Sequence, residues 1–415
     1  MRNSPFWWFL IGFMVLLDIY VFQALKLVTI SASGRNRTII YAVYWTVSVV
    51  ALLILLILPY LHFQHQSKLF RTTVFAIVMG LFFAKLITAL FLLIDDIRRG
   101  VQWIAGKLSG SQPEEGIQQS EKITRSVFLS WMGMAAGGGI FASLLYGFSN
   151  KYNYQVKKVK LAFAKVPASF KGVKIAQLSD IHCGSFTDKQ AVIKGIELVM
   201  KQKPDLILFT GDLVNNIADE MEDYMDVFNR LNAPLGVYSV LGNHDYGDYS
   251  KWDTEAEKIE NLEKLKAIHG TLGWRLLMNE HVVLDRNDEK IALIGVENWS
   301  AKARFPKHGN LEKAYAGSSE YPFKILMSHD PSHWDAQVRK FYPDIDLMLA
   351  GHTHGMQFGI EIPGFRWSPV QYVYKQWAGL YEQGAQKLYV NRGFGFIGYP
   401  GRVGILPEIT LFELV

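Results

Sequence analysis

The sequence is poor in cysteine, and it lacks a basic stripe, an internal repeat and a long low-complexity tract. Its one cysteine, Cys183, cannot form an internal disulfide, so cysteine usage does not reveal the redox compartment. The net charge of +5 is spread along the chain without interleaved aromatic residues, which gives no indication of nucleic-acid binding. Hydrophobic residues make up 50% of the chain and are concentrated in its first third, which sets that third apart from the rest.

Four long apolar runs in this first third are each near the ~20 residues that a helix needs to cross a bilayer. They are residues 5–25, 39–61, 72–94 and 127–148. A cleaved signal peptide does not fit the first run, because the run is long and no small-residue cleavage site follows it. Four buried core helices are the alternative, which the length of the runs and their lack of amphipathicity disfavour. We therefore expect a transmembrane region at residues 1–150 and a catalytic domain at residues 151–415.

Two charged residues, Asp18 and Lys85, lie inside the first and third runs at equal depth. A lone charge in the middle of a bilayer is costly, so a mutual salt bridge is the favoured interpretation and a proton or substrate path is the alternative. In the fourth run, Gly133 and Gly137 form a small-residue face that predicts close approach of another helix.

The rest of the chain contains a series of short polar blocks, most of which follow a run of β-branched and aliphatic residues. The blocks are Asp180-Ile181-His182, Gly211-Asp212, Gly242-Asn243-His244-Asp245, Ser328-His329-Asp330 and Gly351-His352-Thr353-His354. Their positions predict that the polar residues sit at strand ends, and an open α/β sheet gathers its chemistry at the carboxyl ends of its strands. Mixed Asp, Asn and His ligands suit Mn, Fe or Zn better than an all-oxygen Mg or Ca cage. The blocks therefore predict a two-metal site.

Strands alternating with helices predict an α/β fold for this part of the chain. Strands are expected at residues 156–163, 173–178, 206–209, 237–241, 281–284, 291–296, 325–327, 347–350 and 388–391, and helices at residues 191–201 and 220–231.

In their order, the blocks resemble the calcineurin-like metallophosphoesterase superfamily, whose pattern is D-x-H, GD, GNH[DE], H and GHxH. The resemblance covers residues 156–415, and the closing stretch 391–409 is similar to the membrane-associated bacterial branch. It implies a four-layer αββα sandwich, here preceded by the four-span region. It also implies a metal-dependent phosphoric ester hydrolase with two divalent metal ions. Mn, Fe or Zn are expected, with Mg as an alternative.

Position by position, the resemblance implies one metal ligand set of Asp180, His182 and His354, another of Asn243, His329 and His352, and Asp212 as the bridge. It further implies attack by a metal-bridging hydroxide, with His244 as the general acid beside the leaving oxygen. Many relatives have an Asp three residues after the GD aspartate, where this chain has Asn215, so we expect Asp245 to orient His244 instead. Met356 replaces the second glycine of GHTHGGQ and is expected to narrow the pocket mouth.

Two arginines come after the last metal block, in or beside the Gly-rich loops 393–398 and 401–404. Arg392 or Arg402 could bind a substrate phosphate oxygen bidentately, and capping of loop carbonyls is the alternative. Four further histidines match no block and are interpreted as surface or packing residues, with His333 the closest rival of His329. They are His269, His281, His308 and His333.

The expected function is that of a membrane-anchored phosphoesterase acting on a phosphate mono- or diester. A substrate linked to lipid or to cell-envelope material is expected, because tethering raises the enzyme's concentration against a substrate in the same bilayer. Two alternatives remain open. One is a UDP-2,3-diacylglucosamine diphosphatase, an activity that the superfamily contains, with a cytoplasmic active site. The other is a membrane sensor or transporter with a phosphoesterase output domain.

The orientation in the membrane depends on a weak signal. Lys and Arg near the span ends are almost equally distributed between the two sides, so they do not decide it. Residues 124–129 (Thr-Arg-Ser-Val-Phe-Leu), followed by an apolar run, resemble a twin-arginine export signal whose second arginine is replaced by Ser126. Exported relatives carry such a signal just before this domain. We therefore expect a protein of the bacterial inner membrane with an extracytoplasmic catalytic domain.

Overall fold

The computed structural model describes residues 5–57, 68–108 and 125–415, and the chain divides into two compact units, Met1–Tyr146 and Gly147–Val415. The first unit contains α1 (Pro5–Val28), α2 (Gly34–Ile57), α3 (Lys68–Leu108) and α4 (Arg125–Gly147). All 4 helices are long and apolar enough to cross a membrane. Each expected span falls on one of them, although residues 58–61 of the second span lie outside the described residues.

Helix α3 continues well past residue 94, where the expected third span ends. The polar residues beyond that point pair with one another along the helix and do not interrupt it. Asp95 accepts from the Arg98 guanidinium at 2.8 Å and lies 3.3 Å from the Arg99 guanidinium. Because these pairs are spaced by three and four residues, they support the continued helix.

A buried polar cluster joins three helices of this unit. Lys85 of α3 forms a salt bridge with Asp18 of α1, as the sequence predicts. Ser48 of α2 donates to Asp18 at 3.0 Å and accepts from Lys85 at 2.8 Å. The Tyr44 hydroxyl donates to the backbone oxygen of Asp18 at 2.8 Å, so α2 completes a network that the two charges alone did not reveal.

The small-residue face of α4 lies against α3. Thr88 donates its hydroxyl to the backbone oxygen of Gly133 at 3.0 Å. A Cβ at Gly137 would collide with the backbone of Ala84, so the glycines permit the close approach that the sequence predicts.

The second unit is built around two six-stranded sheets and a short hairpin. In spatial order, the first sheet contains β1 (Gln155–Leu161), β14 (Glu408–Leu414), β2 (Lys174–Leu178), β3 (Leu206–Phe209), β4 (Val237–Ser239) and β5 (Arg275–Leu276), and the second contains β12 (Gly379–Gln383), β13 (Gln386–Val390), β9 (Leu347–Ala350), β8 (Lys324–Met327), β7 (Glu289–Gly295) and β6 (Glu280–Arg286). The hairpin is β10 (Ile360–Ile362) with β11 (Phe365–Trp367). The helices are α5 (Lys189–Lys201), α6 (Met225–Phe228), α7 (Glu255–Thr271), α8 (Leu311–Tyr315) and α9 (Arg339–Phe341).

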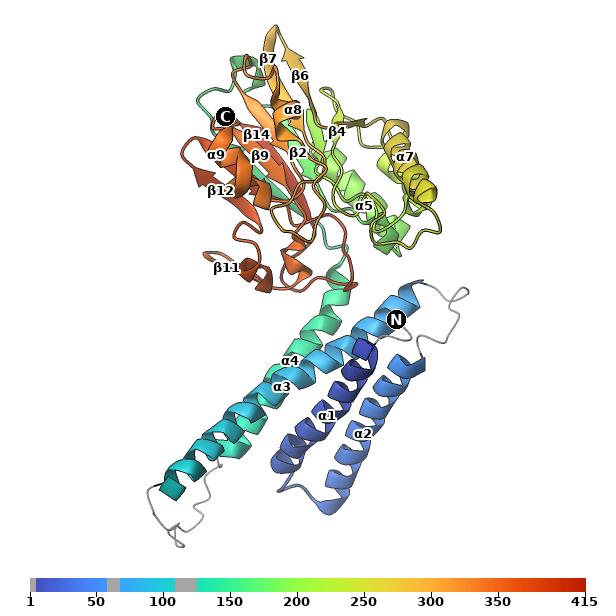
Figure 1. Ribbon diagram of the computed structural model, residues 1–415, viewed down its shortest axis with the longest axis vertical. Helices are drawn as coiled ribbons and strands as arrows, with labels where there is room; N and C mark the ends of the chain where they lie inside the picture. The colour runs from blue at the N-terminus through green and yellow to red at the C-terminus, as the bar shows by residue number, and fades with distance from the viewer. Residues whose placement is uncertain (1–4, 58–67, 109–124) are drawn as a thin grey trace. The chain divides into compact units, whose positions relative to one another are not determined.

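Alternating side chains place each sheet between two apolar layers. Ile175 and Leu208 of the first sheet pack with Ile325 of the second in the core between the sheets. Their chain neighbours face outward, so that Phe209 packs beneath the helices. Figure 1 shows α5 and α7 on the side of β2 and β4, and α9 on the side of β9 and β12. The four-layer αββα arrangement that the family resemblance implies is therefore present.

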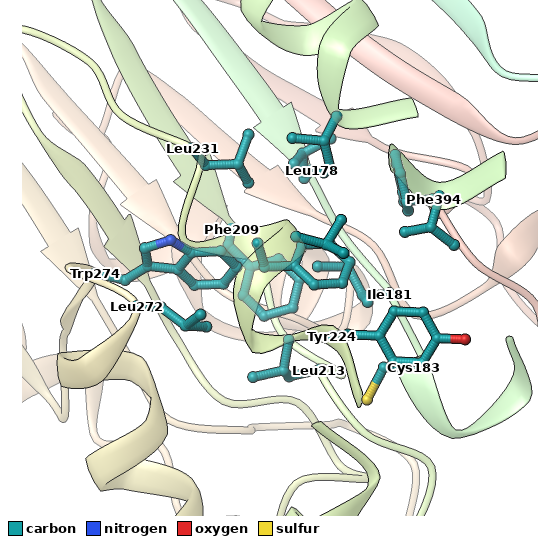
Figure 2. Packing of buried hydrophobic residues seen from close by; sticks show 14 of the residues in the cluster. Leu178, Ile181, Cys183, Phe209, Leu213, Tyr224, Leu231, Leu272, Trp274 and Phe394 are labelled. Carbon is teal, nitrogen blue, oxygen red and sulfur yellow. The ribbon is translucent and has the colours of Figure 1, made fainter. Parts of the chain in front are cut away.

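The layer of side chains outside the first sheet is drawn in Figure 2, where Phe209 and Trp274 pack with ring centroids 5.4 Å apart. Cys183 belongs to the same cluster and is 1% exposed. Its side chain therefore packs in this core, whereas Asp180 and His182 of the same block belong to a cluster that could hold a metal ion.

The helix expected at residues 220–231 is present only as the short α6. Residues Ala218–Tyr224 form 3-10 turns, and only the short α6 comes after them. Glu220 turns into the preceding loop and accepts the Asn215 backbone N–H at 2.6 Å, which holds the chain in turns. Helix α7 was not expected, because its charged sequence lacks a continuous apolar stripe and it buries few residues, among them Leu265 and Ile268.

Candidate metal centre and pocket

The polar blocks converge at the carboxyl ends of the central strands. Asp180 and His182 follow β2, and Asp212 follows β3, which is parallel to β2. Asn243 and His244 follow β4. From the second sheet, His329 follows β8, and His352 and His354 follow β9, again a parallel pair. The sheets therefore bring together residues far apart in the chain, as their positions in the sequence predict.

One cluster that could hold a metal ion contains Asp180, His182 and His354, whose ligand atoms lie within 4.8 Å of one another. The two imidazole Nε2 atoms are 3.0 Å apart, and the His354 Nε2 lies 3.3 Å from Asp180 Oδ1. Nitrogen and oxygen lone pairs directed at one point suit a shared cation.

A second cluster that could hold a metal ion contains Asp212, His329 and His352. His329 Nε2 lies 3.2 Å from His352 Nδ1 and 3.1 Å from Asp212 Oδ2. The same Asp212 oxygen is 3.5 Å from His182 Nε2, so this carboxylate faces both clusters. That is the position required of a bridging ligand between two cations.

Asn243 supplies an independent test of whether metal ions fit here. Its Oδ1 is buried and has no hydrogen-bond partner among the residues that the structure describes. Its Nδ2 donates to the Tyr249 hydroxyl at 3.0 Å, which fixes the orientation of the amide. A buried carbonyl oxygen without a donor is costly, and a cation satisfies it. The donor set of Asp, Asn and His therefore fits two divalent cations.

The backbone at these residues is held in an unusual conformation. Asp180 (φ 52), His182 (φ 47), Asp212 (φ 62), His352 (φ 72) and His354 (φ 50) all adopt the left-handed region. Non-glycine residues are uncommon there, and such strain gathers at functional sites, where the surrounding structure holds it in place.

Burial and neighbouring charges shift the pKa values at the two clusters in different directions. Burial lowers the pKa of His182 to about 3 and the pKa of His352 to about 4, which favours the neutral imidazole that metal ligation requires. The Asp212 carboxylate instead raises the pKa of His329 to about 10, against the effect of burial. Burial also raises the pKa of Asp180 to about 6, with a contribution from the nearby Asp212 carboxylate. Burial opposes ionisation of Asp212 as well, but His329 outweighs it and holds the pKa of Asp212 well below its usual range.

The orientation of His244 differs from the expectation. Its Nδ1 lies 2.7 Å from the backbone oxygen of Asn215, which therefore provides the orienting contact. The Asp245 carboxylate is instead occupied by backbone N–H groups, including those of Asp212 at 2.9 Å and Leu213 at 2.8 Å. Asp245 thus fixes the loops that carry the clusters, and the expected pairing with His244 is corrected. Burial raises the pKa of Asp245 to about 7.

The two arginines proposed from the sequence make internal contacts. Arg392 is 3% exposed and pairs with Glu408 and Glu361. Arg402 is fully buried and donates to the backbone oxygens of Gly393 and Gly395 at 3.1 and 2.6 Å. Within the described part of the chain, neither is among the residues that line the pocket. These contacts favour the alternative, in which both arginines stabilise loops.

A pocket of about 340 Å³ opens over both clusters. It is lined by cluster residues together with Arg304, Phe305, Met356, Val370, Val373, Tyr374 and Ile397. Met356 therefore lies at the pocket, as its place in the last block predicts. The sequence reasoning missed Arg304, although its neighbours Lys302 and Lys307 make residues 302–307 locally basic.

Tyr374 is a further residue that was missed, and it orients a cluster histidine. Its hydroxyl lies 2.8 Å from His352 Nε2 and donates to Asp330 at 3.1 Å. This chain of contacts places the proton of His352 on Nε2 and leaves Nδ1, which faces His329, for a metal. Asp330 is the last residue of the Ser-His-Asp block, so the sequence did contain part of this signal.

His333, the rival of His329, is used in packing. Its Nδ1 lies 2.9 Å from Ser328 Oγ, its Nε2 lies 2.9 Å from Gln337, and its ring stacks on Trp299. The other unassigned histidines make local contacts, such as the 2.9 Å contact between His269 Nδ1 and Ser239.

Comparison with known proteins agrees with this geometry. Residues 1–151 match the model described as "Probable Calcineurin-like phosphoesterase, transmembrane domain", and residues 173–356 match that of "Calcineurin-like phosphoesterase". Phosphodiesterase YaeI of Escherichia coli is 30% identical over 270 residues, which cover 63% of this chain and 88% of YaeI. The chain belongs to the calcineurin-like metallophosphoesterase family.

Further relatives include both bacterial and animal metallophosphoesterases. The "Uncharacterized metallophosphoesterase YkuE" of Bacillus subtilis is 29% identical over 303 residues, covering 71% of this chain and 98% of YkuE. The "Transmembrane protein with metallophosphoesterase domain" of Danio rerio is 30% identical over 265 residues, covering 62% of this chain and 56% of that protein. Together with the apolar helices, the family assignment makes this metallophosphoesterase an integral membrane protein and a metal-dependent phosphoric ester hydrolase.

Proposed function

We propose that this membrane-anchored metallophosphoesterase hydrolyses a phosphate diester or monoester at a dinuclear metal centre in the pocket. The observation that carries the proposal is the Asp212 carboxylate, which faces both ligand clusters at once. We assign Asp180, His182 and His354 to one ion and Asn243, His329 and His352 to the other. The name of YaeI, a phosphodiesterase, supports a diester as the first substrate to test.

Two divalent cations at these ligands would supply a nucleophilic hydroxide and neutralise charge on the phosphoryl oxygens. The ligands favour Mn, Fe or Zn, with Mg as the alternative. Metal analysis of the purified protein, followed by activity on a panel of monoesters and diesters with each metal, tests the proposal. Absence of metal-dependent turnover on the entire panel would contradict it.

We assign the general acid to His244. The Asn215 carbonyl occupies its Nδ1, which leaves Nε2 to hand a proton to the leaving oxygen. The Asp212 carboxylate accepts the His244 backbone N–H at 2.9 Å. This hydrogen bond holds the proposed general acid next to the proposed bridging ligand. A backbone carbonyl orients the ring without adding a negative charge, unlike the carboxylate present in many relatives.

We expect His244→Ala to lower kcat by roughly 10²–10⁴-fold with metals retained, because positioned proton transfer contributes about that much. The loss should be smaller for substrates with good leaving groups, which need less protonation. Steady-state kinetics on a leaving-group series and metal analysis check both points. His281→Ala, a histidine outside the clusters, is the matched control. An equal loss across the series would remove the acid role, and loss of metal would make His244 a ligand.

We further assign phosphate binding to Arg304, which lines the pocket and stacks on Phe305 at 4.6 Å. Its guanidinium provides a positive charge on a wall that is otherwise largely apolar, and charge-assisted hydrogen bonds to phosphate are strong.

The two kinds of arginine should respond differently to truncation. We expect Arg304→Ala to raise KM by roughly 10- to 100-fold without a change in stability, given roughly 1.5–3 kcal/mol for a hydrogen bond to a charged group. We expect Arg392→Ala to lower the melting temperature instead, because buried Glu408 would lose its partner. Kinetics and thermal unfolding of both variants check this, and an unchanged KM for Arg304→Ala would remove its assignment.

We propose that the catalytic domain faces away from the cytoplasm, on the strength of the sequence that opens α4. Thr124 of that signal lies outside the described residues, whereas Arg125 begins the helix. Alkaline phosphatase fused after Val415 should be active, and a fluorescent protein that matures only in the cytoplasm should stay dark. The reverse result would favour the UDP-2,3-diacylglucosamine diphosphatase alternative. If the fusions show an extracytoplasmic domain and the protein also transports a solute, the sensor or transporter alternative would be favoured.

A further inference from the structure

The segment that follows the last metal block carries a set of exposed apolar side chains, here called the apolar rim. It consists of Met356, Ile360, Ile362, Phe365, Tyr372 and Val373. Ile362 and Phe365, at the turn of the β10–β11 hairpin, are 58% and 53% exposed, and Tyr372 is 77% exposed. Met356 and Val373 also line the pocket, so these two members of the rim belong to the pocket wall. Exposed apolar patches of this kind mark interaction sites.

The apolar rim is firmly attached to the domain. Beneath it lies a buried cluster of Val370, Tyr374, Trp377, Ala378 and Ile405. The hairpin residue Glu361 binds Arg392 at 2.6 Å, and Arg392 is in turn paired with Glu408 of β14. The hairpin that carries the exposed apolar side chains is thus attached to the sheet. Buried Arg392 makes this attachment by pairing with both Glu361 and Glu408.

Backbone hydrogen bonds connect the hairpin to the residues that end a candidate membrane span. The fourth candidate span comprises Arg125–Asn150, and its residue Gly147, the first of the catalytic unit, accepts the Arg402 backbone N–H at 2.9 Å. The next residue, Val403, donates to Gln357 at 2.8 Å and accepts from Gly359 at 2.9 Å, directly before β10. Gly147, where the catalytic unit begins, is therefore connected through Arg402 and Val403 to the residues that lead into β10.

The charges around the pocket suit an anionic headgroup. Between Glu297 and Glu312 the chain has no acidic residue but contains Lys302, Arg304 and Lys307. Lys302 donates to the backbone oxygen of Val373, a residue of the apolar rim, at 2.9 Å. Basic side chains next to an apolar surface are typical of proteins that bind anionic lipid.

We propose that the apolar rim inserts into the bilayer surface and holds the hydrocarbon chain of a membrane lipid phosphoester while the phosphate occupies the pocket. This inference rests on the proposed function and names the substrate class of the same site. A lipid could then pass from the bilayer to the metal centre with its hydrocarbon chain shielded from water throughout, which lowers the cost of extraction.

Insertion can be measured without turnover. Because Cys183 is buried, Ile362→Cys gives one accessible thiol for an environment-sensitive fluorophore. The full chain would be reconstituted in phosphatidylcholine–phosphatidylglycerol vesicles that contain spin-labelled lipid. Phe341→Cys, at a 69% exposed position on α9, is the matched control. We expect at least fivefold stronger quenching at position 362 than at position 341, and equal quenching at the two positions would overturn the insertion.

Kinetics test the substrate class. The probes are p-nitrophenyl phosphodiesters with a methyl or a hexadecyl group, assayed with Ile362→Ser/Phe365→Ser and with Phe341→Ser as the control. We expect the double variant to lose about tenfold or more in kcat/KM for the hexadecyl probe and less than about twofold for the methyl probe. An equal loss of kcat/KM for both probes would overturn the proposal. So would a change in oligomeric mass of the double variant with no change in kcat/KM for the hexadecyl probe. Failure of the proposed function appears separately, as no metal-dependent turnover of the methyl probe by the unaltered protein.

Discussion

Replacing Asp212 by Asn should reduce turnover on the order of 10³-fold or more while the protein remains folded. The Asp212 Oδ2 atom lies 3.5 Å from His182 Nε2 and 3.1 Å from His329 Nε2, so it serves both clusters. An amide in its place removes the negative charge between two cations and presents N–H groups to them. The Asn side chain retains an oxygen for the His244 backbone N–H, which explains why the loop should persist.

The measurements are turnover at saturating metal, metal content and thermal unfolding. Asp219→Asn, an exposed carboxylate outside the clusters, serves as the matched control for a loss of charge. Turnover of Asp212→Asn above a tenth of the unaltered protein would end the assignment of Asp212 as the bridge. Loss of metal together with loss of turnover would support it.

The ligand clusters could be predicted because the information is local. Most blocks follow a run of apolar residues, and the residues that succeed parallel strands meet at one edge of a sheet. His329 follows β8 and Asp212 follows β3 in different sheets, yet both strand ends meet at the centre. The blocks were therefore sufficient to indicate which residues gather, and the family resemblance supplied the expected chemistry.

The missed residues depend on how loops pack. The contact that orients His244 comes from the backbone carbonyl of Asn215, and because every residue has a carbonyl, the sequence cannot mark this one. Tyr374 reaches His352 through a turn whose path depends on the buried cluster around Trp377. Arg392 looked suitable for phosphate, but its partner Glu361 belongs to a hairpin that the sequence did not predict.

The same limit applied to secondary structure. Strands β3 and β9 have the predicted bounds, because fully buried strands appear as uninterrupted apolar runs. Helix α7 was missed, since most of its surface faces solvent and its capping by Thr254 is a weaker signal than an apolar stripe. Periodicity therefore identified most strands, including the half-exposed β1 and β6, but it missed the exposed helix α7 and the buried strand β14.

In the membrane unit, the equal depth of Asp18 and Lys85 was enough to predict their pairing, whereas Ser48 and Tyr44 could not be chosen from the many polar side chains of α2. In this network, Asp18 of α1 accepts hydrogen bonds from side chains of α2 and forms a salt bridge with α3. It therefore fixes which faces of α1, α2 and α3 meet, a specificity that apolar packing alone does not supply in lipid.

Removing one member of the Asp18–Lys85 pair should destabilise the membrane unit by roughly 3–5 kcal/mol, because an unpaired buried charge remains. Asp18→Leu and Lys85→Leu should each lower the melting temperature in detergent, whereas the double Leu variant should melt near the unaltered protein. Lys189→Met, which breaks an exposed ion pair with Asp226, is the control and should leave the melting temperature unchanged. A double variant as unstable as the single ones would contradict a purely structural pair. A double variant that folds normally but loses phosphoesterase activity would instead give the charges a function, since its loss could not be attributed to an unpaired charge.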